Sequence, residues 1–414
     1  MKQLLAVSAL ITLALAAGMV FSLEPLGLRY HLDADVYRLG ARELLADAHL
    51  YTATYLTRVG PLPFTYPPFA ALIFLPLAPL SDVGAGLVLT LVNLALPAVL
   101  AYLVLRHLRV ARPGAWTLLL LPVMLVAEPV WETVAFGQIN LVLATLVLVD
   151  ALVLAPRGSR WRGLLTGLAA GVKLTPLVFI LVPLFRRDLR GGAGVLAGFL
   201  GTGLLGALAA PQATREYLAG VLGDTGRIGN AEYAANQSLA GVFARVGVEQ
   251  LWLPSLAVVG AAVVIALERE HRRGGDPLAM VLLASLVATL GSPVSWSHHW
   301  VWLVPTTIYL AVSGWRTRRR WSRLLAGLGA AAMLARPHWL LPHGGGTETA
   351  WPWWAQVVGS SYVVIGLVFL AAMTLRSRGT ARAGGLSASR AAARSASNGA
   401  TGAGSTTTSG RGSW

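Results

Sequence analysis

Long apolar segments recur along this chain, and they constrain its fold more than any other feature. Runs of about 18 or more apolar residues are long enough to cross a bilayer as helices. Of the 414 residues, 55% are hydrophobic and only 12% are charged, whereas soluble domains usually carry about 25% charged residues. A membrane β-barrel would show alternating segments of about ten residues instead. The sequence therefore predicts an all-α polytopic membrane protein.

Basic residues lie in short clusters between the apolar segments, and basic loops remain on the cytoplasmic side of a membrane. Under this rule the chain crosses the membrane in about ten full spans. Two further elements, 68–80 and the Gly- and Pro-interrupted segment 163–185, enter the membrane and return. Residues 128–138 form an outer loop. The full spans are predicted at 1–21, 86–105, 118–127, 139–154, 194–210, 251–267, 278–290, 301–312, 324–334 and 357–373.

The same rule predicts a plasma-membrane protein with both termini in the cytoplasm. We expect the first apolar segment to stay as an uncleaved helix, because Lys2 precedes it and many spans follow. Residues 1–373 would form the membrane domain, and 374–414 a disordered basic tail without acids. This tail is either solvated or in weak contact with anionic membrane lipids. The net charge of +15 lies in short loops, so a nucleic-acid partner is not expected.

Two carboxylates, Asp33 and Asp35, lie where the chain leaves the first apolar segment, in a sequence with few acids. Acids at the start of a helix can simply interact with its free N–H groups. A carboxylate at the membrane surface can also act as a general base that takes the proton from a hydroxyl nucleophile. Residues spaced i, i+2 point in different directions. One could therefore be the base while the other orients the acceptor or supports an arginine.

Other polar side chains are predicted to gather on the outer face, where they would suit a sugar site. His298 and His299 begin a span and could compensate the charge of a phosphate leaving group. Lys173 is either functional or reaches the cytoplasmic interface, since a charge within an apolar run is costly. Gln138 and Asn140 are either sugar contacts or ordinary polar residues at a helix start.

The remaining candidates for substrate binding are aromatic or carboxamide residues of the outer segments. Tyrosine and tryptophan also anchor membrane proteins at the interface, so it is their convergence on one face that favours a sugar site. The chain has no cysteine, and no His/Glu pair at helical spacing accompanies the two histidines. Neither a metal nor a cofactor is therefore expected. These remaining candidates are Tyr37, Tyr66, Asn236, Gln237 and Trp296.

Several blocks of the sequence resemble glycosyltransferase family 87, a family of actinobacterial membrane mannosyltransferases, and they occur in the same order as in that family. The resemblance covers about Asp33 to Pro305, and the Ser-Trp-Ser-His-His-Trp block is its most specific part. The blocks are Asp33-x-x-Val36-Tyr37-Arg38, Leu50-Tyr51 and 64–72 (FTYPPFAAL), then 137–140 (GQIN), 171–176 (GVKLTP), 236–239 (NQSL) and 292–302 (SPVSWSHHWVW).

This resemblance implies a membrane-embedded fold of the GT-C type, with an active site on the outer face of the plasma membrane. It implies polyprenyl-phosphate mannose as donor and a phosphatidylinositol mannoside, lipomannan or lipoarabinomannan as acceptor, joined by an α-(1→2) linkage. Asp33 aligns best with the catalytic base of the family, Asp35 being one step out of register. The histidine near the donor phosphate falls on His298 or His299. A single displacement from a β-linked lipid phosphate would invert the configuration and would demand no metal.

Three alternatives remain at this level. A GT-C transferase of another lipid-linked sugar would share the same residues. A transporter or glycolipid flippase would carry broken helices and an intramembrane lysine, but it also predicts an inverted repeat, which the hydropathy and motifs do not show. A non-catalytic scaffold would leave the polar outer blocks unexplained.

Overall fold

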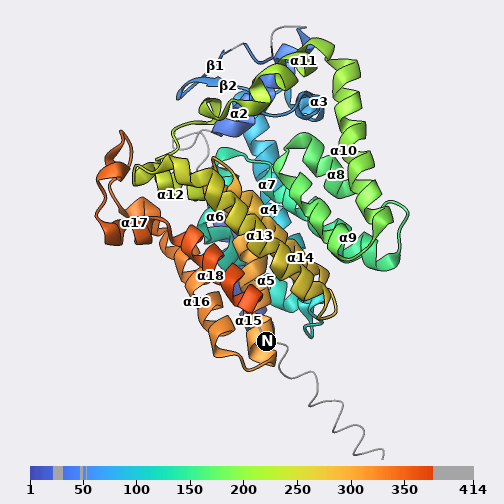
Figure 1. The fold of residues 1–414 in the computed structure, drawn as a ribbon, viewed down its shortest axis with the longest axis vertical. Coiled ribbons are helices and arrows are strands. Elements are labelled where there is room, and N and C mark those ends of the chain that lie inside the picture. The colour runs from blue at the N-terminus through green and yellow to red at the C-terminus, as the bar shows by residue number, and fades with distance from the viewer. Residues whose placement is uncertain (22–30, 47–49, 53, 376–414) are drawn as a thin grey trace, which may run out of the picture. The chain divides into compact units, whose positions relative to one another are not determined.

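The computed structural model describes residues 1–21, 31–46, 50–52 and 54–375. Residues Met1–Thr374 form one compact unit of helices joined by short connections (Figure 1). The predicted tail, 374–414, lies outside the described residues from residue 376 onward. The first helices are α1 (Lys2–Phe21), α2 (Leu32–Leu45), α3 (Pro68–Ile73), α4 (Asp82–His107), α5 (Pro113–Val126), α6 (Glu128–Phe136), α7 (Asn140–Val149), α8 (Leu164–Val172) and α9 (Leu181–Phe185).

The second half of the unit continues the same pattern, and its helix α14 lies at the centre of the packing. The residues from Leu278 to Ala284 are all fully buried, as expected of a helix that is apolar all round. The helices of this half are α10 (Leu189–Ala209), α11 (Pro211–Ala219), α12 (Leu239–Arg245), α13 (Trp252–His271), α14 (Pro277–Gly291), α15 (Leu303–Arg316), α16 (Arg320–Ala335), α17 (Trp353–Gly359) and α18 (Ser361–Leu375).

The predicted class of helical membrane protein is confirmed, and each predicted span overlaps one helix or a pair of consecutive helices. Among the described residues, five helices are long and apolar enough to cross a membrane, or up to seven if each of two bent pairs is one span. The pair α5 and α6 bends by 68°, and the pair α17 and α18 bends by 74°. The five helices cover Lys2–Val20, Asp82–His107, Asn140–Arg157, Leu189–Ala209 and Glu249–His271.

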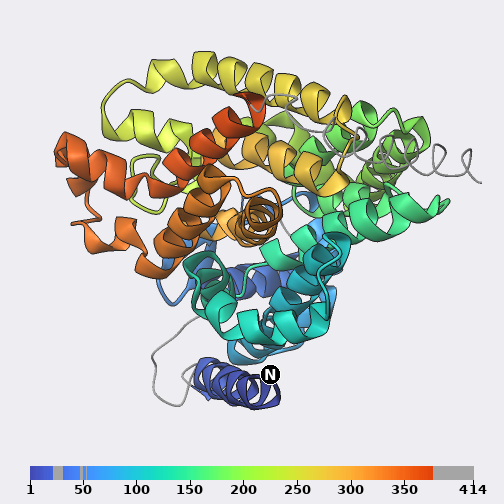
Figure 2. The same cartoon turned by 90° about the horizontal axis from the view of Figure 1, so that it is seen from below.

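Helix α1 lies at the edge of the unit, against α4 and α5 (Figure 2). The hydroxyl of Ser8 donates to the carbonyl oxygen of Leu118 across 2.6 Å. Leu4, Leu10 and Leu13 are more than 60% exposed. Apolar side chains that face outward in this way suit a helix in contact with lipid.

Two expectations about local structure are wrong. Residues 128–138, predicted as an outer loop, are mostly helix α6. The segment is not exposed at its start, because Glu128 is fully buried and its carboxylate is hydrogen-bonded within the protein. The chain is also not purely helical. Strands β1 (Thr54–Thr57) and β2 (Gly60–Pro63) pair antiparallel, with Thr54 opposite Pro63. Four-residue strands that contain proline give little signal in a sequence.

The predicted break within 163–185 is present and falls at Lys173. Helix α8 ends at Val172, Lys173 is extended with φ −147° and ψ 131°, and a short 3-10 helix (Thr175–Ile180) leads into α9. Gly171 allows α8 to lie close to α10, because a Cβ there would stand 1.9 Å from Oγ1 of Thr202. The break and the close packing together place Lys173 at the end of α8 rather than along its side.

Candidate functional site

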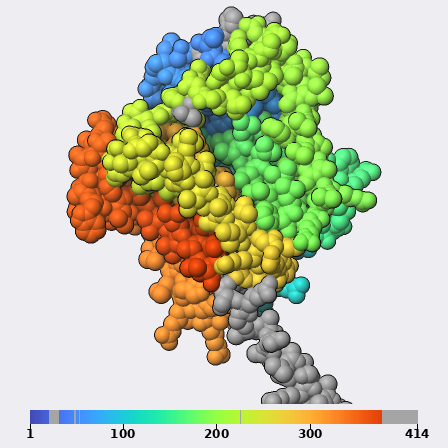
Figure 3. Space-filling view, viewed as in Figure 1, coloured from blue at the N-terminus to red at the C-terminus, as the bar shows by residue number. Residues whose placement is uncertain are grey.

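A cavity of about 450 Å³ lies among the start of α2, the segment after β2, the α6–α7 turn, the break after α8 and the segments 217–235 and 292–299. The space-filling view is hollowed between the yellow-green segment that includes α11 and the green helices α8 and α10 (Figure 3). Seven of the predicted site residues, far apart in the sequence, line this one cavity: Asp33, Tyr66, Gln138, Lys173, Trp296, His298 and His299.

Asp33 is half-buried in the first turn of α2, where it faces the cavity beside Gln138. Burial raises the pKa of Asp33 to about 6, whereas a hydrogen bond with the Gln138 side chain and the positive charge of Lys173 lower it. Its carboxylate is therefore ionised at neutral pH but more basic than an exposed one. Both properties are needed in a general base.

Two tyrosines fix the orientation of the Gln138 amide. The hydroxyl of Tyr37 donates to Oε1 of Gln138 across 3.0 Å, and the hydroxyl of Tyr66 lies 2.9 Å from that of Tyr37 and 3.4 Å from the same Oε1. Because Oε1 faces the two hydroxyls, the amide nitrogen is the atom left to donate to Asp33. Tyr37 lies one helical turn after Asp33, on the same face of α2. It is fully buried and supports the site from behind the cavity wall.

Gly137 brings Gln138 against α2. It has a φ of +65°, and a Cβ at this position would stand 2.7 Å from Cβ of Ala34. The carbonyl oxygen of Gln138 accepts a hydrogen bond of 2.8 Å from Nδ2 of Asn93. The α6–α7 turn is thus held from both sides, and its position sets the distance between Gln138 and Asp33.

Lys173 provides a positive charge beside the two histidines. Its Nζ donates to Oδ1 of Asn140 and to Nε2 of His299, each across 3.1 Å, and it lies 5.6 Å from the centre of the Tyr66 ring. An ammonium has donors only, so Nε2 of His299 accepts and this imidazole is neutral. The charge compensation expected of His298 and His299 is thus shared with Lys173, and the role of the two imidazoles stays a prediction.

His298 is placed so that its ring can reach a ligand. Its carbonyl oxygen accepts from Nδ2 of Asn140 at 3.1 Å and from Oγ1 of Thr133 at 3.4 Å. Its ring packs against Phe136 with centroids 5.4 Å apart. Nε2 is buried and has no hydrogen-bond partner among the described residues. A buried polar atom at a cavity wall is costly to leave unpaired, so it is a candidate ligand contact.

Asn236 and Gln237 do not line the cavity but shape the turn that leads to the histidines. Oδ1 of Asn236 accepts from the backbone N–H of Ser295 at 2.9 Å, and the N–H of Gln237 donates to the Ser295 carbonyl at 2.8 Å. The carbonyl of Gln237 accepts from Nε1 of Trp300 at 2.9 Å. Asn140 also lies outside the lining of this cavity, and it faces a smaller pocket together with Lys173 and His299.

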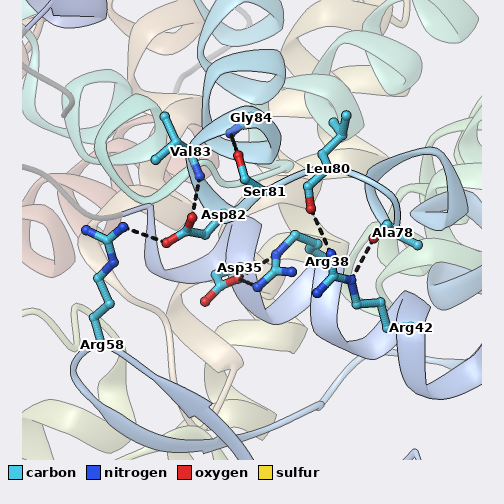
Figure 4. A network of polar contacts seen from close by, with 10 residues as sticks. All are labelled: Asp35, Arg38, Arg42, Arg58, Ala78, Leu80, Ser81, Asp82, Val83 and Gly84. Atoms are coloured by element: carbon cyan, nitrogen blue, oxygen red, sulfur yellow. Dashed lines mark hydrogen bonds and ion pairs between the residues drawn. The ribbon is translucent and has the colours of Figure 1, made fainter. Parts of the chain in front are cut away.

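Asp35 also lies outside the cavity lining. It is 4% exposed, and its carboxylate accepts a bond of 2.8 Å from Nε of Arg38 (Figure 4). In the same network Arg42 donates to the carbonyl oxygens of Ala78 and Leu80. This side of α2 therefore joins the helix to the segment before α4. Asp33 and Asp35 therefore face different surroundings, as their i, i+2 spacing predicts.

Five further cavity residues with a charged, tyrosine or tryptophan side chain are not among the predicted site residues. Arg227 is a cation between the predicted spans 194–210 and 251–267, and its charge is the signal in the sequence that could have identified it. Within the described residues, no group of three or more His, Asp or Glu side chains could hold a metal ion. The five residues are Tyr217, Asp224, Arg227, Tyr233 and Trp339.

The fold and the cavity define a helical membrane protein with a carboxylate, an amine and two imidazoles at one site. The sequence pattern of glycosyltransferase family 87 matches residues 64–293, which is more than half of the chain. The chain belongs to this family, and the family expected from the sequence blocks is confirmed. No solved structure matches the chain.

Three curated proteins illustrate the family relationship. A Mycobacterium tuberculosis protein named polyprenol-phosphate-mannose-dependent alpha-(1-2)-phosphatidylinositol mannoside mannosyltransferase is 38% identical over 375 residues, covering 85% of this chain and 86% of its own. Its namesake from Mycolicibacterium smegmatis is 37% identical, with 82% and 84% covered. A phosphatidylinositol pentamannoside mannosyltransferase of the same species is 34% identical, with 84% and 86% covered.

Proposed function

We propose that this chain transfers a mannosyl residue from polyprenyl-phosphate mannose to a phosphatidylinositol mannoside, forming an α-(1→2) linkage with inversion. The donor, the linkage and the acceptor class are those in the names of the relatives. The observation that carries the proposal is that Asp33, Lys173 and His298 line one cavity. Together these residues supply a base and a cation, as glycosyl transfer from a lipid phosphate requires.

Asp33 acts as the general base in this mechanism. Its carboxylate accepts the proton of the acceptor 2-hydroxyl while that oxygen attacks the anomeric carbon of the donor mannose. The bond between the anomeric carbon and the phosphate oxygen breaks, and polyprenyl phosphate leaves with the electron pair. The raised pKa of Asp33, about 6, favours proton uptake while keeping the carboxylate ionised at neutral pH.

Lys173 and His298 act on the leaving group. The ammonium of Lys173 stabilises the negative charge that grows on the phosphate, and the unpaired Nε2 of His298 supplies a further hydrogen-bonding position. The smaller pocket that shares Lys173 and His299 is lined mainly by apolar side chains, including Leu143 and Phe179. We place the donor phosphate at Lys173; this smaller pocket, at about 40 Å³, is too small to hold the polyprenyl chain.

The membrane topology belongs to the same proposal. We place the cavity on the outer side of the plasma membrane and both termini in the cytoplasm, following the positions of the basic loops. Helices α14, α15 and α16 have 14 to 16 residues, and they cross as short spans in addition to the five long helices and the two bent pairs, each pair counted as one span. Short spans are tolerated at a modest cost through local thinning of the bilayer. The total is then ten.

The test of this function is a transfer assay in membranes from a host without family 87 enzymes. The chain is expressed and supplied with a phosphatidylinositol mannoside and either labelled polyprenyl-phosphate mannose or labelled GDP-mannose, with donor synthesis blocked. We expect label in the glycolipid from the lipid donor alone, and its release by an α-(1→2)-specific mannosidase. Transfer from the nucleotide donor alone, or label that resists the mannosidase, would overturn the proposal. Movement of the unmodified lipid donor across the bilayer without transfer would support a flippase instead.

A further inference from the structure

Three aromatic side chains from separate segments meet on one side of the cavity. The ring of Tyr233 lies 6.1 Å from that of Trp296 and 6.0 Å from that of Trp339, measured between centroids. All three residues line the cavity and are half-buried. We call Tyr233, Trp296 and Trp339 the aromatic wall.

The aromatic wall is held in place by buried polar groups. Nε1 of Trp339 donates across 3.2 Å to Oε1 of Glu128, a fully buried carboxylate that also accepts from the hydroxyl of Tyr362 at 2.9 Å. Trp296 pairs through its backbone with Asn236. An interfacial anchor has no need of such support, and Trp353, which is 80% exposed, illustrates that kind of tryptophan. The fixed ring of Trp339 and the fixed backbone of Trp296 support a binding surface.

A hexopyranose suits this surface. Its axial C–H groups form an apolar face that stacks on an aromatic ring, while its hydroxyls remain available for hydrogen bonds. Tyrosine and tryptophan combine an apolar ring with a polar edge, and sites of about 300–1,000 Å³ hold ligands of several rings. The cavity of about 450 Å³ falls in this range.

The proposed donor carries one hexose, and its phosphate is assigned to Lys173. Any sugar ring beyond this donor hexose would belong to the acceptor. We propose that the aromatic wall binds the acceptor mannosyl residue next to the one that is extended, so that the enzyme selects acceptors with at least two mannosyl residues. This inference rests on the proposed function and adds a second sugar subsite to it.

The experiment compares two soluble acceptors, an octyl α-mannoside and the matching octyl dimannoside, with the purified full chain in micelles. Equilibrium binding of both acceptors is measured by calorimetry, and transfer from polyprenyl-phosphate mannose gives kcat and KM. The variants are Tyr233→Leu and Trp339→Leu. Tyr233→Phe retains the ring, and Trp353→Leu removes an exposed tryptophan outside the wall.

The proposal predicts that the wild type prefers the dimannoside on the order of tenfold, mainly through KM and Kd. In Tyr233→Leu and Trp339→Leu this preference falls to about onefold. Tyr233→Phe and Trp353→Leu keep the full preference. An unchanged preference in both leucine variants, or an equal loss with both acceptors, would overturn the subsite.

The binding measurement distinguishes a failure of the subsite from a failure of the proposed function. If the wild type transfers no mannose but binds the dimannoside more tightly, and loses that preference in Tyr233→Leu, the subsite stands and the donor assignment fails. If the wild type transfers mannose but binds and uses both acceptors equally, the subsite fails and the proposed function stands. If neither binding nor transfer distinguishes the two acceptors, the subsite is contradicted on both counts.

Discussion

The hydroxyl of Tyr37 donates to Oε1 of Gln138 across 3.0 Å, joining α2 to the turn between α6 and α7. The bond lies entirely within the protein, since Tyr37 is fully buried. This bond orients Gln138 toward Asp33. Because the amide oxygen faces the tyrosine hydroxyls, the amide nitrogen faces the carboxylate of Asp33. The candidate base is thus positioned by residues more than 100 positions apart.

The proposed base determines the pH dependence of transfer. The pKa of Asp33 is raised to about 6, and only the ionised form can accept a proton. Activity is therefore retained above this pKa and lost below it. We expect kcat/KM for the acceptor to fall about tenfold per pH unit below pH 6, as measured by initial rates across the acid range. A rate that stays constant down to about pH 4.5 would exclude a base with this pKa.

A glutamate at position 138 tests the positioning role of Gln138. Gln138→Glu keeps an oxygen for Tyr37 and Tyr66 but places a second carboxyl group beside Asp33. A neighbouring like charge disfavours ionisation, so we expect the acid limb of the kcat/KM profile to move up by about one pH unit or more. If the limb does not move and only the acceptor KM rises, Gln138 contacts the sugar instead.

Removal of the cation should affect the chemical step more than binding. Lys173→Met leaves the leaving group without its ammonium, and losing one such charge or donor typically costs on the order of 10²- to 10³-fold in kcat. Lys173→Arg retains a charge and should recover part of the rate. Single-turnover measurements with saturating donor report this step directly. A methionine variant with normal kcat and a raised donor KM would limit Lys173 to ground-state binding.

Two glycines with nearly the same backbone conformation separate crowding from strain. Gly137 and Gly158 have φ values of +65° and +63°, but a Cβ at position 137 meets Ala34 at 2.7 Å, whereas one at position 158 meets nothing within 4 Å. Both alanine variants should lose about 1–2 kcal/mol of stability through the positive φ. Gly137→Ala should also lose most of its activity, because Gln138 moves away from α2. Equal activity in the two variants would contradict this account.

The membrane helices could be predicted from the sequence because apolar runs and basic loops are local signals. The broken helix at Lys173 was predictable for the same reason, since Gly171 and Pro176 flank the lysine in the sequence. Helix α6 was missed because its first residue, Glu128, is charged. Partners more than 200 residues away, including Tyr362, satisfy this carboxylate, and no local pattern reveals them.

The site itself could be predicted in composition but not in arrangement. The blocks supplied the seven residues that meet around the cavity, yet the division between Asp33 and Asp35 depends on Arg38, which pairs with Asp35 inside the protein. The charge of Lys173 and the neutral state of His299 depend on a contact across 126 positions. Tyr233 and Trp339 lie in segments whose positions are set by tertiary packing. Their role had no sequence signal beyond that of an aromatic residue.

The most direct test of the central claim is a comparison of Asp33→Asn with Asp35→Asn. Each is assayed for mannose transfer from polyprenyl-phosphate mannose at equal expression, and its thermal stability is measured alongside. Asp33→Asn should lose at least about 10³-fold in kcat while remaining as stable as the wild type or more so, because it removes a partly buried charge. Asp35→Asn should lose stability through the broken pair with Arg38 but keep its pH profile and most of its kcat. Full transfer by Asp33→Asn, or a selective loss of kcat in a stable Asp35→Asn, would contradict the assignment of Asp33 as the base.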